Sequence, residues 1–262
     1  MTTHEYWRKQ TLADPLFPDI EWNRPEQRAH AGRLAIIGGS KLGFVGVRDA
    51  YETASALGAG QIRAILPDVL KRSVPTSVAD AVFLPSNQSG GFSRKALGEF
   101  EAACAWADVC LLVGDAGRNS ETAMAFETLL TAPSRLVATR DAVDLVMPAM
   151  NQLVERENTV FVVSFAQLQK MFQSVYYPKI LSFSMQLMQL VETLHKFTIT
   201  YPVTIVTFHN SQLVVAHGGE VVTQEFDQPM AIWRGITATR AATYLLWNPT
   251  KPLEAIATSF NT

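Results

Sequence analysis

The sequence predicts an α/β fold in which a mostly parallel central sheet lies between two layers of helices. Short apolar runs that suit strands alternate with helical segments from residue 33 onward, and this alternation is typical of parallel βαβ units. The run 109–113 (VCLLV) is continuously apolar, as in strands of a parallel sheet that are buried on both faces. The chain of 262 residues is long enough for one large domain of this kind.

Each element follows from its local pattern. The first strand ends in Gly38-Gly39-Ser40, the second stops at Pro67, and the strand at 109–113 runs into a glycine-containing turn at 114–117. Two late strands lie side by side around a turn at 209–211. In chain order, strands are predicted at 34–37, 62–66, 109–113, 136–138, 159–163, 203–207 and 213–216. Helices are predicted at 49–57, 100–107, 120–130, as a pair filling 166–197, at 236–247 and at 252–260.

Residues 1–27 differ in composition and form an N-terminal arm, which leaves 28–262 as a single domain. Prolines suppress regular structure in the arm, and its aromatic side chains suggest that it packs on something, either its own domain or a partner subunit. The residues concerned are Pro15, Pro18 and Pro25, and Trp7, Phe17 and Trp22.

Composition excludes several classes of function. A net charge of −2, from 22 basic and 24 acidic residues, argues against a nucleic-acid surface. The most apolar late stretch, 180–199, contains polar residues such as Glu192 and Lys196, so no membrane span is expected. No apolar segment typical of a signal peptide follows the N-terminus, and two cysteines make no disulfide framework, so the cytoplasm is expected. The five histidines lack metal-ligand spacing, so no metal site is expected.

Several motifs, spread over roughly residues 28–258, resemble the ADP/ATP-dependent NAD(P)H-hydrate dehydratases of the ribokinase-like superfamily. The resemblance implies a ribokinase-like three-layer α/β/α fold. The family's opening Lys-Gly-x-x-Gly-Arg turn corresponds to 28–33 (RAHAGR), its Gly-Gly-Ser strand end to 38–40 (GGS), and its Ala-Gly-Ala-Gly segment to 57–60 (LGAG). Its Gly-Pro-Gly-Leu-Gly-Arg loop corresponds, one residue shorter, to 114–118 (GDAGR), and its Asp-Ala-Asp-Ala-Leu segment to 139–143 (TRDAV). Its C-terminal Leu-Leu, Pro and Glu-Ala pattern is kept as 245–246 (LL), Pro252 and 254–255 (EA).

The departures fall on the family's chemistry. Its Gly-x-Gly-Asp motif, in which the Asp is the general base, falls on Trp233-Arg234-Gly235-Ile236, and an Ile side chain accepts no proton. Its His-Pro-Gly-Glu motif falls near 164–167 (SFAQ), without the imidazole or the carboxylate, and its late Lys-Gly falls near 208–209. The glycine replaced by Trp233 otherwise allows close approach of the backbone to a phosphate. Scaffold glycines are kept and site residues are lost.

The ligand-binding candidates lie beyond strand carboxyl ends, where such sheets bind their ligands. An anion cradle at 38–40 and a tight turn without a ligand are both open. At 114–118 we favour a plain turn, since the negative charge of Asp115 would repel a phosphate. Asp141 is either a polar site residue or a cap for the following helix. Arg234 and Arg240 flank a predicted helix start. They either bind an anion there or belong to a solvated face of the helix. The candidate set is Gly38, Gly39, Ser40, Gly114, Gly117, Asp141, Arg234 and Gly235.

Two functions are compatible with this pattern. The first is a catalytically impaired homologue that binds a nucleotide or dinucleotide or acts as a scaffold, with no catalytic residue assigned. The second is an enzyme, the family dehydratase or a small-metabolite kinase, in which Asp227, Asp141 or Asp115 replaces the lost base. The family activity, if retained, implies ADP or ATP with Mg²⁺ as cofactors.

The resemblance also implies a homo-oligomer. The aromatic arm and the Met/Phe-rich segment 171–188 provide more apolar surface than one helix pair needs, although packing within one chain remains the alternative. A symmetric dimer or tetramer with an interface in 165–195 is therefore predicted.

Overall fold

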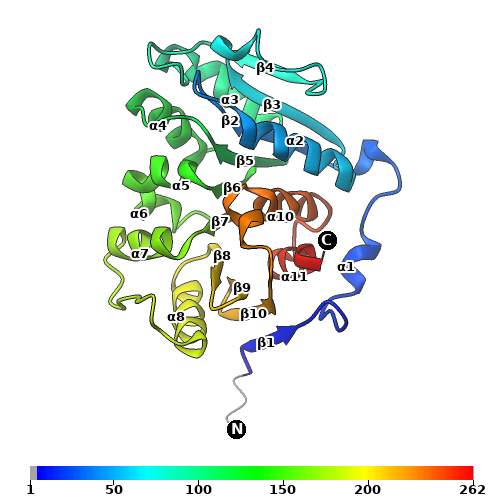
Figure 1. Cartoon of the computed structure of the whole chain (residues 1–262), viewed down its shortest axis with the longest axis vertical. Helices are drawn as coiled ribbons and strands as arrows, with labels where there is room; N and C mark the ends of the chain where they lie inside the picture. Colours follow the sequence, from blue (N-terminus) through cyan, green and yellow to red (C-terminus); the bar gives the residue numbers. More distant parts are fainter. Residues whose placement is uncertain (1–4, 262) are drawn as a thin grey trace.

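The computed structural model, which describes residues 5–261, contains a ten-stranded central sheet in the order β1-β10-β9-β8-β7-β6-β5-β2-β3-β4 (Figure 1). Neighbouring strands from β8 to β4 are parallel, whereas β8, β9 and β10 pair antiparallel and β1 is parallel to β10. The mostly parallel α/β sheet predicted from the sequence is confirmed. The strands are β1 (Trp7–Gln10), β2 (Arg33–Gly38), β3 (Gln61–Pro67), β4 (Ala81–Leu84), β5 (Val109–Gly114), β6 (Arg135–Thr139), β7 (Thr159–Val163), β8 (Thr204–His209), β9 (Gln212–His217) and β10 (Glu220–Glu225).

Helices cover both faces of the sheet. The α-helices are α1 (Asp19–Trp22), α2 (Val45–Leu57), α3 (Leu97–Ala105), α4 (Ser120–Glu127), α5 (Asp141–Val146), α6 (Met150–Leu153), α7 (Phe165–Ser174), α8 (Leu187–Thr200), α9 (Pro229–Trp233), α10 (Ile236–Trp247) and α11 (Pro252–Thr258). Short 3₁₀ helices join them: η1 (Arg28–His30), η2 (Asp68–Leu70), η3 (Arg94–Ala96), η4 (Thr128–Leu130), η5 (Met147–Ala149) and η6 (Ser259–Asn261).

Two separate apolar cores give the molecule its three layers. Side chains of α3 to α8 pack on one face of the sheet, and side chains of α2, α10 and α11 pack on the other. The strands alternate between them, so Ile205 belongs to the first core and Val206 to the second. Cys104 and Cys110 are both buried in the first core, as expected for small apolar groups.

The N-terminal arm contains more regular structure than its prolines predict. Residues 7–10 form β1, the edge strand beside β10, and residues 19–22 form α1. The buried Gln10 side chain donates hydrogen bonds to the Gln224 side chain at 2.6 Å and to the Ala257 carbonyl at 2.7 Å. These contacts hold the first strand on its own domain, because they satisfy a buried amide that otherwise costs free energy.

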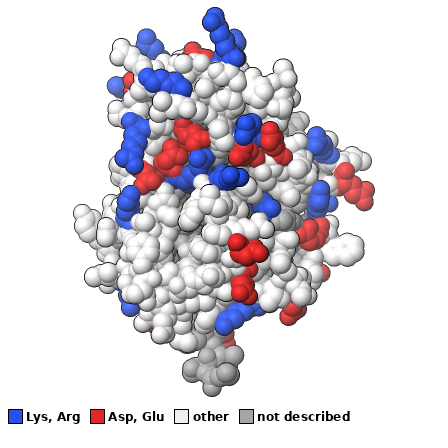
Figure 2. Space-filling view, in the orientation of Figure 1, with Lys and Arg blue, Asp and Glu red and all other residues white. Residues whose placement is uncertain are grey.

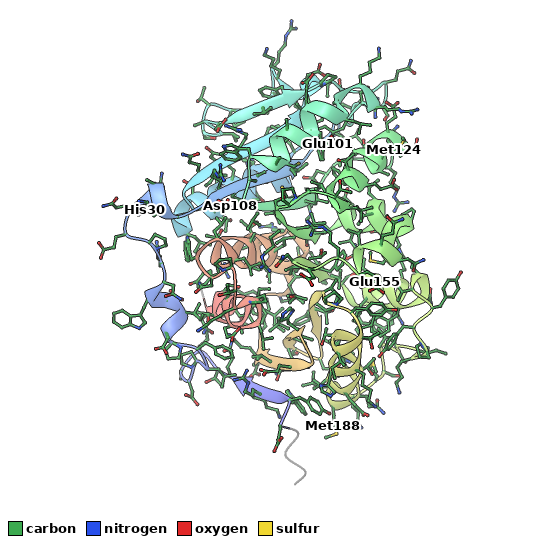
Figure 3. All side chains as sticks on the ribbon, turned by 180° about the vertical axis from the view of Figure 1, so that it is seen from behind. His30, Glu101, Asp108, Met124, Glu155 and Met188 are labelled. Atoms are coloured by element: carbon green, nitrogen blue, oxygen red, sulfur yellow. The ribbon has the colours of Figure 1, made fainter. Side chains whose placement is uncertain are left out.

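The Met/Phe-rich segment is split between the core and the surface. Met171, Phe172 and Met185 are buried, whereas Phe183 and Met188 are exposed. Met188 lies at the start of α8 and is labelled in Figure 3, which shows the molecule from behind. The predicted helix pair is α7 and α8, separated by an irregular segment at 175–186. No helix within residues 5–261 is both long and apolar enough to cross a membrane.

Candidate functional site

Three cavities open at the carboxyl edge of the parallel strands, and Asp141 lines all of them. The β6–β7 cavity, of about 330 Å³, is lined by Thr139, Arg140, Asp141, Asp144, Val162, Ser164, Ala166, Gln167, Lys170, Ile232 and Trp233. The β2–β5 cavity, of about 290 Å³, is lined by Ser40, Leu42, Gly43, Val45, Asp115, Gly117 and Asp141. The α4–α5 cavity, of about 410 Å³, is lined by Gly117, Arg118, Asn119, Ser120, Ala123, Asp141, Asp144, Leu145, Pro148 and Lys170.

Asp141 is held by the backbone of the preceding strand connection. The amide of Asp115 donates to Oδ1 of Asp141 at 2.9 Å. Gly114 allows this approach, because a Cβ there would lie 2.0 Å from the same oxygen. No side chain within residues 5–261 caps α5, whose N-cap residue is Arg140, so the helix-capping alternative for Asp141 is wrong. The carboxylate is fixed at one oxygen, at the point where the three cavities meet.

The turn after β5 has a second role besides linking two elements. The carboxylate of Asp115 accepts a hydrogen bond from Arg140 at 2.7 Å and from the Gly46 amide, at the start of α2, at 2.6 Å. Both charged side chains are about four-fifths buried. A partly buried pair of this kind ties β5, β6 and α2 together more firmly than an exposed pair would. Asp115 is therefore committed to structural contacts.

Arg140 has an unusual environment. Its backbone lies at φ 55° and ψ −143°, a region that costs a non-glycine residue about 1–3 kcal/mol. Its Nη1 is buried and has no hydrogen-bond partner within the described residues. Gly46 makes room for the guanidinium, since a Cβ at that position would lie 1.8 Å from Nη1. Strain and an unsatisfied buried donor are concentrated next to the cavities, as is common at binding sites.

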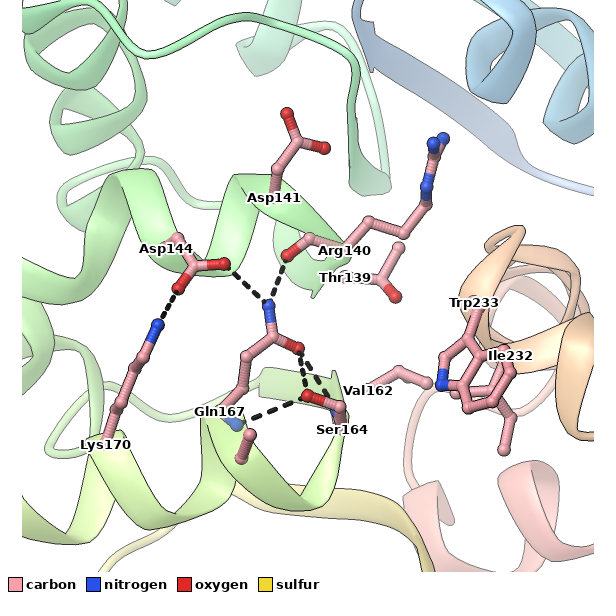
Figure 4. A pocket seen from close by; sticks show the side chains of 11 residues that line it. Thr139, Arg140, Asp141, Asp144, Val162, Ser164, Gln167, Lys170, Ile232 and Trp233 are labelled. Carbon is pink, nitrogen blue, oxygen red and sulfur yellow. Dashed lines mark hydrogen bonds and ion pairs between the residues drawn. The ribbon is translucent and has the colours of Figure 1, made fainter.

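The start of α7 forms one wall of the β6–β7 cavity. Ser164 caps the helix by accepting from the Gln167 amide at 3.2 Å, and Gln167 Oε1 accepts from the Ser164 amide at 3.1 Å. The Nε2 of Gln167 donates to the Arg140 carbonyl at 2.7 Å and to Asp144 at 3.0 Å (Figure 4). Three residues of the segment where the family resemblance places His-Pro-Gly-Glu thus line a cavity, namely Ser164, Ala166 and Gln167, and they carry a hydroxyl and an amide in place of the imidazole and the carboxylate.

The start of α10, where the resemblance places the phosphate-binding motif, is differently built. Gly235 adopts φ +84°, and no side chain in the described part of the chain caps the helix. The Thr237 hydroxyl in the first turn is buried and has no partner among residues 5–261. Ile236 occupies the first helical position and is half-buried. The helix start therefore offers unsatisfied donors and no proton acceptor at position 236.

Arginines surround this helix start unevenly. Arg234 is exposed. Arg240 is half-buried, and this burial lowers the pKa of its guanidinium from the usual value. The Cδ of Arg140 would lie 3.3 Å from a Cβ placed on Gly235, whereas its guanidinium is paired with Asp115. Amides, a hydroxyl and guanidinium groups suit an anion better than a cation.

The amides of the Gly38-Gly39-Ser40 turn are already engaged. Those of Gly39 and Ser40 donate to the carbonyls of Gly114 and Gly43, each at 2.9 Å. Gly38 packs so closely on β5 that a Cβ would lie 2.2 Å from the Gly114 carbonyl oxygen. Ser40 reaches the β2–β5 cavity. The turn thus holds two strands together and contributes one side of that cavity.

The other sequence candidates are divided by the fold. Gly117 lines two cavities, whereas Asp227 is exposed and lines none of the three. Sequence reasoning did not select Arg140, Gln167 and Trp233 as site residues. For Gln167 a signal existed, since Ser-x-x-Gln is a capping-box pattern. Within the described residues, no group of three His, Cys, Asp or Glu side chains has the arrangement to hold a metal ion.

No protein-family model matches the sequence, and a search of curated protein sequences finds no match. Solved structures do match. A ribokinase-like superfamily protein from Enterococcus faecalis has a TM-score of 0.73 and 17% identity, over 100% of this chain and 88% of that chain. An ADP/ATP-dependent NAD(P)H-hydrate dehydratase from Bacillus subtilis, co-crystallized with ATP/Mg²⁺, has a TM-score of 0.57 and 13% identity, over 94% and 85%.

A third solved structure extends the match to kinases. A phosphomethylpyrimidine kinase from Clostridium difficile has a TM-score of 0.53 and 10% identity, over 87% of this chain and 97% of that chain. Identities this low carry the architecture and no more. This chain has the ribokinase-like α/β/α fold.

Proposed function

We propose that the chain binds a nucleotide or dinucleotide at the carboxyl edge of its sheet and that it is catalytically impaired. One observation carries the proposal: within residues 5–261, no side chain caps the start of α10 and the buried Thr237 hydroxyl has no partner, while the first helical residue is Ile236. Unsatisfied donors at a helix start favour an anion such as a phosphoryl group. An aliphatic side chain at position 236 removes the base that phosphoryl transfer to a hydroxyl group uses.

Two further observations support a nucleotide as the ligand. The three cavities give room for more than a phosphate, and they share Asp141. A structure with the same fold, the dehydratase from Bacillus subtilis, was co-crystallized with ATP/Mg²⁺. In the proposed complex, the phosphoryl group contacts the first amides of α10 and Thr237, and Asp141 accepts a hydrogen bond from the ligand.

The first experiment measures binding and turnover together. Thermal-shift titrations with ADP, ATP, AMP and NAD(P)H should raise the melting temperature for at least one ligand, because binding at about 100 times Kd stabilises by roughly 2.7 kcal/mol. Hydrated NADH with ADP or ATP and Mg²⁺ should show no turnover above background. Turnover that survives purification and changes in Ile236→Asp or Arg234→Gly would contradict the impaired state. The absence of a shift with all four ligands would contradict the binding function.

An active enzyme is the second candidate, and Asp141 is the observation that favours it. Asp115 is occupied by Arg140 and Gly46, and Asp227 lies outside the cavities. Asp141 has one oxygen fixed by the Asp115 amide and lines all three cavities at the carboxyl edge. If it acts as the base, Asp141→Asn should abolish turnover while nucleotide binding persists. A wild-type protein without turnover removes this candidate.

We also propose a symmetric homo-oligomer that uses part of residues 165–195. Tyr176, Ile180, Phe183 and Met188 are exposed in this segment, and Figure 2 shows few charged side chains over α7 and α8 on that face. Large exposed apolar side chains on a weakly charged face favour association. Light scattering at micromolar concentration should give a multiple of 28.9 kDa, and a value of 28.9 kDa would refute the oligomer.

A further inference from the structure

The β6–β7 cavity has one aromatic wall, the indole of Trp233. Trp233 ends α9, and 56% of its surface is exposed even though its neighbour Ile232 is buried. Two backbone hydrogen bonds hold this turn, from Arg234 to Met230 at 2.9 Å and from Gly235 to Ile232 at 3.0 Å. An indole left open in a cavity retains a large apolar face that a ligand can cover. The backbone of Trp233 is therefore held by the fold, and much of its indole is left uncovered.

The opposite wall is polar and already assembled. Figure 4 shows Gln167 and Ser164 across the cavity from Trp233. Hydrogen bonds to Arg140, Asp144 and Ser164 fix the Gln167 amide, and Lys170 pairs with Asp144 at 2.9 Å. Ser164 and Asp141 are also among the residues that line this cavity. A largely preformed pocket with one aromatic face and a few oriented polar groups is typical of a small-molecule site.

We propose that Trp233 stacks on a planar heterocyclic ring bound in the β6–β7 cavity, the base or pyridine ring of the nucleotide ligand. Such a ring is apolar on its face and polar along its edge, and the cavity offers an indole for the face and polar lining residues, Ser164 among them, for the edge. The volume of about 330 Å³ accommodates a ring of this size. The inference rests on the proposed nucleotide function and names the group that recognises the ring.

The stacking role is specific to this chain, because Trp233 stands where the motif that the chain resembles has a glycine. A glycine offers no surface for stacking. Here the same backbone position brings an indole to the cavity while Gly235 keeps the left-handed turn into α10. A purely aliphatic ligand suits the cavity less well, because Ser164, Asp144 and Lys170 line it and their polar atoms would lose hydration against a hydrocarbon.

The test separates the ring from the phosphate. The variants are Trp233→Leu, Trp233→Phe and, as a matched control on a distant exposed tryptophan, Trp22→Leu; Trp22 lies on α1 and is 85% exposed. The probes are ADP, adenosine, inorganic pyrophosphate and ribose 5-phosphate, measured by calorimetry. ADP should bind about tenfold more weakly to Trp233→Leu, as for loss of one base–aromatic stack. Trp233→Phe should keep most of the affinity, and Trp22→Leu should equal the wild type.

Fluorescence gives an independent readout. Adenosine should quench tryptophan emission in the wild type and in Trp22→Leu, and should not do so in Trp233→Leu. Pyrophosphate should bind all variants equally. Equal losses for ADP, pyrophosphate and ribose 5-phosphate in Trp233→Leu would overturn the stacking role. Pyrophosphate binding without any gain from the adenine ring would overturn it while leaving the phosphate site of the proposed function intact. No binding of any probe to the wild type would overturn both.

Discussion

Helices α7 and α10 both begin at the carboxyl edge of the sheet, but their first turns are satisfied in opposite ways. At α7, Ser164 and Gln167 form a reciprocal capping box, and the remaining Gln167 donor bonds to the Arg140 carbonyl and Asp144. At α10, the N-cap is a glycine without a side chain, and the buried Thr237 hydroxyl finds no partner within the described residues. Two helix starts on one edge thus differ in how many polar groups remain unsatisfied.

The two helix starts contribute differently to stability and to ligand binding. Buried polar groups are nearly always hydrogen-bonded, so a helix start that lacks partners has a cost that local folding alone does not explain. The start of α7 contributes stability and shapes a wall. The start of α10 leaves its donors open, and we interpret this as capacity for a ligand. Removing the Ser164 hydroxyl from one start and the Thr237 hydroxyl from the other should therefore change stability in opposite directions.

The largest effect is expected at the glycine that opens α10. Gly235→Ala should lower the free energy of unfolding by about 2 kcal/mol, because φ is +84° and an L side chain disfavours that conformation. Urea unfolding measures the loss. Gly98→Ala is the control, since no described atom lies within 4 Å of a Cβ on this exposed residue of α3. That variant should gain about 0.5–1 kcal/mol. Equal stability of the wild type and Gly235→Ala would show that the turn has no conformational role.

The capped helix start should lose stability when its cap is removed. Ser164→Ala removes an acceptor for the Gln167 amide and half of the capping box, so the free energy of unfolding should fall by about 1 kcal/mol. Ser174→Ala, at the exposed end of the same helix, should change it by a few tenths at most. Chemical denaturation compares the two variants. A loss as large in Ser174→Ala would show that α7 does not depend on its cap.

The uncapped helix start should gain stability when its unpartnered hydroxyl is removed. Thr237→Val keeps the shape and deletes a buried group without a partner, so the ligand-free protein should become more stable by roughly 1 kcal/mol. The same variant should bind ADP more weakly. Thr239→Val is the matched control, because its hydroxyl donates to the Gly235 carbonyl at 2.9 Å and its removal should destabilise. Destabilisation by Thr237→Val would break the comparison between the two helices.

The smallest effect is expected far from both helix starts, at His217 on β9. Burial, and next the positive charge of Arg135, lower the pKa of this imidazole from its usual value. The unfolded chain then binds the proton more readily, so stability is present above the ordinary histidine pKa of about 6.5 and is lost as pH falls through the lower folded pKa. Stability measured from pH 7.5 to 5 should fall more steeply in the wild type than in His217→Gln. Identical slopes would exclude this contribution.

Local patterns alone were sufficient for the parallel core of the fold. The continuously apolar run of β5 and the glycines after β2 and β5 mark buried strands and the connections beyond them, and these features depend on neighbours in sequence. The antiparallel turn between β8 and β9 was also legible, and the structure places it at Asn210 and Ser211. The sequence predicted turns at Gly38 and Gly114, but it did not show that the two glycines let neighbouring strands pack closely.

The edge strands required tertiary structure. Residues 7–10 (WRKQ) have no apolar alternation, and they form β1 because β10 offers its edge and Gln224 pairs with Gln10. The other edge strand, β4, was also missed, since a strand of four residues takes its stability from its partner, and so was β10, which lies between β1 and β9. The prolines of the arm therefore gave a misleading indication of irregular structure.

The α/β class, the glycine turns at the carboxyl edge and the aliphatic residue at position 236 all follow from the sequence. Which polar groups meet at that edge follows from the packing of the whole chain. It committed Asp115 to Arg140, brought Asp141 to three cavities, and set Trp233 opposite Gln167. The reason is physical: helices and turns depend on residues a few positions apart, whereas a site depends on side chains from separate strands, and the register and packing of the whole sheet set their distances.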